Sequence, residues 1–148
     1  LEEALPRLRD ERTTLGREAE LVRAFLAVHQ VRMGARLAVE IDVPAELGAR
    51  EVPPMALLTL VENALKHGLQ PLVGSGAIRV AARADAGRLV LTVADSGVGM
   101  GSGSGHGTGL ANLRARLKSM YGAAASLTLA LNEPRGVIAT ITLPERSP

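Results

Sequence analysis

The amino-acid sequence predicts an α+β fold of two layers, with helices packed on a sheet. Segments whose apolar residues recur at helical spacing are interspersed with segments in which every second residue is apolar, as in strands. Several neighbouring strand segments are also separated only by short turns, as in hairpins. Because hairpins join antiparallel strands, a doubly wound parallel sheet is disfavoured.

The composition fits one globular domain and excludes several classes of function. The chain has 148 residues, 47% hydrophobic and 22% charged. It has no cysteine, which excludes disulfides and thiolate metal sites. Phe25 and Tyr121 are the only aromatic residues, and 17 Lys and Arg spread along the chain oppose 15 Asp and Glu, so we expect no nucleic-acid partner. No apolar run approaches the roughly 20 residues that span a bilayer.

The first half of the chain predicts a helix, a strand and a second helix. Residues 15–33 have helical spacing, follow the candidate N-caps Thr13 and Thr14, and precede a glycine. Residues 36–43 alternate between apolar and polar side chains and predict a half-buried strand. The apolar spacing of residues 55–69 predicts the second helix, and Pro54, just before this run, suits the first position of a helix.

The second half predicts four strands and one helix. Residues 78–83 and 89–94 form a predicted hairpin around an Asp-Ala-Gly turn. An apolar stripe that begins at Leu110 and is closed by a glycine predicts a helix, and two strands follow at 126–131 and 137–143.

A glycine-rich segment, residues 95–109, separates the hairpin from the last helix. Seven of the thirteen residues from Gly97 to Gly109 are glycine. A flexible linker is one interpretation, but a strand leads into the segment and an amphipathic helix leads out of it. We therefore favour a lid that ends at a helix N-terminus, where free N–H groups and the helix dipole attract phosphate. The segment is neither a P-loop nor a dinucleotide-binding motif.

The helix predicted at 55–69 carries a polar cluster in the sequence LVENALKHG. Asn63, Lys66 and His67 lie at positions i, i+3 and i+4, so they share one face, and Glu62 is adjacent to it. A solvated face with a Glu62–Lys66 ion pair would explain the pattern. An amide oxygen is, however, a suitable Mg²⁺ ligand, and a lysine suits phosphate.

Together these segments resemble the GHKL ATP-binding fold of histidine kinases, type II topoisomerases, MutL proteins and related chaperones. The sequence is most similar to the LytS-type sensor histidine kinases. PPMALLTLVENALKHG resembles their N box, DSGVGM the first glycine box, and GHGTGLANLRARLKSMYG the second glycine box with its helix. The closing ITLP is also typical. The resemblance implies a Bergerat-type sandwich: a mixed, mostly antiparallel sheet with helices on one face.

The resemblance assigns the N-box residues to the phosphates of ATP. Asn63 would ligate the Mg²⁺ that bridges the phosphates, and Lys66 and His67 would lie near the phosphate groups. Glu62 is the candidate catalytic residue, which would orient a water molecule or the metal shell.

The glycine boxes would hold the base and close the site. Asp95 would accept a hydrogen bond from the adenine amino group, while Gly97 and Gly99 would let the backbone pass close to the base. The end of the lid would place backbone N–H groups on the phosphate chain. The residues assigned to it are Gly107, Thr108, Gly109 and Leu110, with Asn112 in support. The sequence departs from the family at Leu58, often Gln, and at Gly136-Val137, often Gly-Thr.

The resemblance also implies how the chain is organised. Residues 1–34, which contain RAFLAVHQVRM, would form a helical linker at the end of the dimerisation and phosphoacceptor region, and residues 35–148 the catalytic domain. None of His29, His67 and His106 has the sequence context of a phosphoacceptor. The acceptor is therefore expected on a helical domain upstream of this sequence.

The predicted function is that of the ATP-binding catalytic domain of a two-component sensor histidine kinase, with ATP and Mg²⁺ as ligands. Implied partners are the phosphoacceptor domain, a response regulator and a second copy of the full-length protein. The domain would be cytoplasmic, in a parent protein anchored in the inner membrane. The alternatives are an anti-sigma-factor-type serine kinase on the same fold and a non-catalytic nucleotide-binding partner module. All these interpretations require Asn63 and Asp95 to face one cleft.

Overall fold

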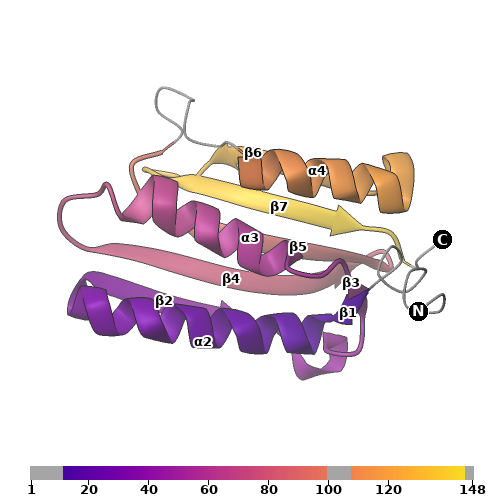
Figure 1. Ribbon diagram of the computed structural model, residues 1–148, viewed down its shortest axis with the longest axis horizontal. Coiled ribbons are helices and arrows are strands. Elements are labelled where there is room, and N and C mark those ends of the chain that lie inside the picture. The colour runs from indigo at the N-terminus through magenta and orange to yellow at the C-terminus, as the bar shows by residue number, and fades with distance from the viewer. Residues whose placement is uncertain (1–11, 100–107, 146–148) are drawn as a thin grey trace, which may run out of the picture.

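A computed structural model, which describes residues 12–99 and 108–145, has a five-stranded sheet behind a layer of helices (Figure 1). The strand order is β2-β4-β5-β7-β6. Strand β2 is parallel to β4, and all other neighbours are antiparallel. The bounds are β2 (Leu37–Asp42), β4 (Gly76–Asp85), β5 (Arg88–Asp95), β6 (Ser126–Leu131) and β7 (Val137–Leu143). The predicted two-layer sandwich with a mostly antiparallel sheet is confirmed.

In the described part of the chain, helices α2, α3 and α4 cover one face of this sheet (Figure 1). Their bounds are α2 (Leu15–Met33), α3 (Ala56–Asn63), which continues into the π-helical segment η3 (Ala64–Leu69), and α4 (Thr108–Tyr121). Two short strands, β1 (Thr13–Thr14) and β3 (Glu51–Val52), pair beside the start of α2. In the described parts of the chain, no helix is both long and apolar enough to cross a bilayer.

The core lies between the helices and the sheet, and aliphatic side chains fill it. Alternate residues of β4 and β7 are buried, as the two-residue period of a strand requires, whereas β5 also buries Val90 between Leu89 and Leu91. In β4 these are Ile78, Val80 and Ala82, while Arg79 between them and Arg83 after them are exposed. The exposed Arg79 and Arg83 lie on the other face of the sheet, which the helices leave uncovered.

Helix α2 has the predicted bounds and caps. The Thr14 hydroxyl accepts a hydrogen bond from the Arg17 amide at 3.3 Å, and Gly34, with a φ of 64°, ends the helix. Its buried side chains, among them Val22 and Leu26, belong to the same core cluster as those of α3. The division of the parent chain between residues 34 and 35 stays a prediction.

The β4–β5 hairpin turns as the sequence predicted. Asp85 pairs with Arg88, and both residues between them have positive φ, 52° at Ala86 and 83° at Gly87. Two positive φ values define a type I′ turn, whose twist matches that of the flanking strands.

The second helix ends at Leu69, as predicted, but it begins later than predicted and changes geometry before its end. It was expected to begin with Pro54 in its first position, but it begins at Ala56, after Met55 in the left-handed region with a φ of 68°. At the other end, the Gln70 amide donates to the Leu65 carbonyl at 2.8 Å, five residues back. The helix therefore widens from α to π geometry beyond Asn63.

The unusual start of α3 is held by a buried carboxylate from α2. Glu18 is 1% exposed, and its two oxygens accept hydrogen bonds from the Met55 amide at 2.8 Å and the Leu57 amide at 3.0 Å. These amides belong to the set that a helix leaves without internal partners at its N-terminus. Glu18 therefore acts as an N-cap from a distant helix and ties α2 to α3.

We expect Glu18→Gln to lower the free energy of unfolding by about 2 kcal/mol, because an amide can accept only one of the two hydrogen bonds and directs its NH₂ group at the other donor. Chemical denaturation measures this change. Glu20→Gln, at an exposed position of the same helix, is the control and should change stability by less than about 0.5 kcal/mol. Equal stability of the two variants would contradict the capping role.

Candidate functional site

The end of the α3–η3 helix and the first glycine box meet through two glycines. A Cβ atom added to Gly97 would lie 2.2 Å from the carbonyl carbon of Gly68, and one added to Gly68 would lie 2.7 Å from Asp95 Oδ1. The Val98 amide also donates to the Gly68 carbonyl at 3.0 Å. Because a real Cβ does not approach other atoms so closely, both positions require glycine.

Asp95 is the last residue of β5, and its side chain lies against Gly68. It pairs with Ile78 of β4 and is only 3% exposed. Its Oδ1 accepts a hydrogen bond from the Gly97 amide at 2.8 Å, which fixes the carboxylate against the chain that follows it. The carboxylate therefore has a defined orientation next to Gly68.

The polar cluster of the second helix divides into two rows. Asn63 and His67, four residues apart, are half-buried, whereas Glu62 and Lys66 are exposed. Thr59 precedes Asn63 by one turn, on the same side of α3. A Cβ added to Gly109 would lie 3.7 Å from Thr59 Cγ2, so α4 begins beside this side of α3. The second helix therefore has two neighbours. Its Thr59 side lies beside the first turn of α4, and its end, at Gly68, lies against Asp95.

The remaining predicted lid residues lie partly outside the described chain. Gly107 falls in the range 100–107, which the structure does not describe. Thr108 and Asn112 are exposed in the first turns of α4, while the Leu110 side chain is 1% exposed and belongs to the core. Leu110 could therefore contribute to a ligand site only through its backbone. Gly99 has a φ of 87°, which favours glycine.

The β6–β7 turn also reaches Asp95, a contact that the sequence analysis missed. The Asn132 side-chain amide donates to the Asp95 carbonyl oxygen at 2.8 Å, and a Cβ added to Gly136 would lie 1.8 Å from the same oxygen. The glycine was visible in the sequence, but nothing there linked Asn132 to a residue 37 positions away.

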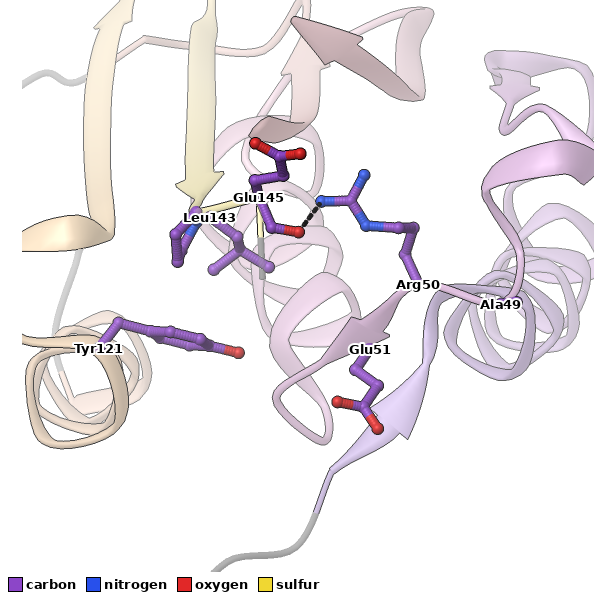
Figure 2. A pocket seen from close by; sticks show the side chains of 7 residues that line it. Ala49, Arg50, Glu51, Tyr121, Leu143 and Glu145 are labelled. Atoms are coloured by element: carbon purple, nitrogen blue, oxygen red, sulfur yellow. Dashed lines mark hydrogen bonds between the residues drawn. The ribbon is translucent and has the colours of Figure 1, made fainter. Parts of the chain in front are cut away.

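A separate hollow of about 390 Å³ lies at the other end of the domain (Figure 2). Arg50 donates there to the backbone carbonyls of Glu145, at 3.2 Å, and Gly87, at 3.3 Å, and so links β3 to the end of the chain's last strand. Leu143, which lines the hollow, pairs with Leu89 at the start of β5, whereas Asp95 ends that strand. This hollow is therefore distinct from the convergence at Asp95.

Comparison with known proteins gives consistent results. Residues 54–147 match the family described as histidine kinase-, DNA gyrase B- and HSP90-like ATPases. The sensor histidine kinase BtsS of Escherichia coli is 31% identical over 92% of this chain and 24% of its own length. The sensor protein LytS of Staphylococcus haemolyticus is 33% identical over 80% of this chain and 23% of its own. The catalytic domain of the histidine kinase ThkA has the same fold, with a TM-score of 0.69 over 93% of this chain and 97% of that domain, at 14% identity.

The fold, the converging glycine boxes and the N-box helix define an ATP-binding sandwich of the GHKL type. The chain belongs to the family of histidine kinase-, DNA gyrase B- and HSP90-like ATPases. It is similar to sensor histidine kinases and spans about a quarter of the length of the curated relatives that it matches.

Proposed function

We propose that this chain is the catalytic domain of a two-component sensor histidine kinase, which binds ATP and presents its γ-phosphate to a histidine on a helical phosphoacceptor domain. The contact of Asp95 and Gly97 with Gly68, which follows Asn63 by five residues in the N-box helix, is the observation that carries the proposal. Phosphoryl transfer needs positioning and charge neutralisation more than covalent work by the protein. A buried, oriented carboxylate suits the adenine amino group, and the N–H groups at the start of α4 suit phosphate.

Mg²⁺ fits the residues at this end of the domain. Among residues 12–99 and 108–145 there is no group of three or more His, Asp or Glu side chains that could hold a metal by themselves. Mg²⁺ commonly takes few protein ligands and completes its shell with water and substrate phosphates. We therefore propose Asn63 as its protein ligand, with Lys66 and His67 near the phosphates and Glu62 orienting a water molecule or the metal shell.

The proposal extends to the rest of the parent protein. The relatives BtsS and LytS are named as sensor proteins, and this chain matches about a quarter of each. We propose a cognate response regulator as the final phosphate acceptor, a homodimeric parent anchored in the inner membrane, and this domain on its cytoplasmic side.

We expect Asp95→Asn to weaken ATP binding about tenfold or more, because the amide replaces an acceptor oxygen by a donor facing the adenine amino group. Calorimetric titration with Mg-ATP measures the affinity, and circular dichroism checks the fold. Asp85→Asn is the matched control, since Asp85 is an exposed residue of the hairpin, 3.3 Å from Arg83. ATP affinity equal to that of the wild type would remove Asp95 from the adenine role.

For Asn63→Ala we expect the increase in ATP affinity on adding Mg²⁺ to disappear, while metal-free binding changes little. The reason is that the variant removes the amide oxygen proposed as the metal ligand. Titrations with and without Mg²⁺ measure the difference, and Gln70→Ala, an exposed amide beyond η3, is the control. A metal dependence that survives in Asn63→Ala would instead favour a solvated face.

Incubation with γ-³²P-ATP should leave this chain alone essentially unlabelled and should label a phosphoacceptor domain supplied in trans. The bound phosphate should be labile in acid and stable in base, as a phosphoramidate is. Acid-stable label on a protein serine would favour the serine kinase, and absence of any ATP binding would leave only the partner module. Strong labelling of His29, His67 or His106 within this chain would overturn the proposal that the acceptor histidine lies on another domain.

A further inference from the structure

The carbonyl group of Asp95 lies just beyond the end of a sheet ladder. The last residue pair of the β5–β7 ladder is Ala94 with Ile138, so Asp95 lies one residue beyond the end of this pairing. A buried backbone carbonyl needs a hydrogen-bond partner. The Asn132 side-chain amide supplies it at 2.8 Å, in place of a backbone N–H group.

The rest of the β6–β7 turn is shaped around this contact. Gly136, with a φ of 116°, approaches so closely that an added Cβ would lie 1.8 Å from the Asp95 oxygen. The backbone N–H of Asn132 donates to the Gly136 carbonyl at 3.0 Å and closes the turn. The Arg135 side chain donates through Nε to the Ser96 carbonyl at 3.3 Å. Side chains of one turn therefore hold two consecutive carbonyl groups at the start of the first glycine box.

Asp95 is thus fixed from two sides. On the helix side, its carboxylate is confined between Gly68 and the Gly97 amide. On the β7 side, its backbone is held by the Asn132 amide. A carboxylate that reads a base must be placed within a few tenths of an ångström, and a hydrogen bond to its own backbone controls that placement.

We propose that Asn132 is a positioning residue of the nucleotide site, whose side-chain amide fixes the backbone of Asp95 and so sets the selectivity of the site for adenine. This inference rests on the proposed function, because it assumes that Asp95 reads the adenine amino group. In this proposal Asn132 does not contact the base; it acts only by holding the Asp95 backbone.

The test compares ATP with ITP, whose base carries a carbonyl where adenine carries the amino group. Wild-type protein should prefer ATP, and Asn132→Ala and Asn132→Asp should both lower the ATP-to-ITP affinity ratio by about fivefold, chiefly through weaker ATP binding. Asn132→Asp keeps the size of the side chain and removes the donor. Thr128→Ala, on an exposed position of β6 in the same hairpin, is the matched control and should keep the wild-type ratio.

The outcomes separate this inference from the proposed function. If Asp95→Asn loses the preference for ATP and both Asn132 variants keep it, the positioning role is wrong and the adenine role of Asp95 stands. If Asp95→Asn binds ATP like the wild type, the adenine role of Asp95 and this inference are both wrong, although the domain still binds ATP. If the wild-type protein binds neither nucleotide, the proposed function itself is at fault. Equal losses for ATP and ITP in the Asn132 variants would indicate a merely structural role and would also overturn the inference.

A measurement on the wild-type protein covers the case in which both variants fail to fold. In ¹H–¹⁵N spectra, the side-chain NH₂ signals of Asn132 should shift on addition of ATP and shift clearly less with ITP at matched saturation. Identical shifts with the two nucleotides, or none with either while Asp95 responds, would contradict the proposal.

Discussion

The site depends on the backbone contact between Gly68 and Gly97. The two residues come from different layers, one from the end of the α3–η3 helix and the other from the segment after β5. Their lack of side chains lets the helix end and the glycine box share one small space, with the Asp95 carboxylate at its edge. A side chain at Gly97 would meet the Gly68 backbone, and one at Gly68 would meet the Asp95 carboxylate, so either substitution would disturb this contact.

The other constraints act on the two partners in this contact. Glu18 fixes where α3 begins, and so helps to set where its far end lies over the sheet. The β6–β7 turn fixes the Asp95 backbone from the opposite side. Residues far apart in the sequence, Glu18 and Asn132, therefore support the position of the N-box helix and of the first glycine box.

The sequence predicted most of the fold because alternation and helical spacing report directly on which side chains face a core. Helix α2 and strands β6 and β7 have the predicted bounds. The glycine boxes and the N box predicted which residues converge, through their order and their resemblance to a family. The structure brings Gly68, at the end of the N-box helix, against Asp95 and Gly97, and the ligand roles of Asn63 and Asp95 stay predictions.

What sequence patterns could not give are contacts set by tertiary structure. A buried Glu18 looks like any charged helical residue, because its partners, the amides of Met55 and Leu57, are backbone groups without a sequence signal. The π-helical end of the second helix has no periodicity long enough to recognise. Asn132 is an ordinary turn residue until the fold places it at a strand end.

The outer strand β2 has a consequence for how this domain behaves at high concentration. An edge strand offers unpaired N–H and C=O groups to any other chain, which is a route to aggregation. Strand β2 is only six residues long, is followed shortly by Pro44, and carries Glu40 and Asp42, which share Arg79 as their ion-pair partner. A foreign strand added there would have to lie beside these charges, so the edge is protected against sheet-to-sheet association and resists amyloid-like growth.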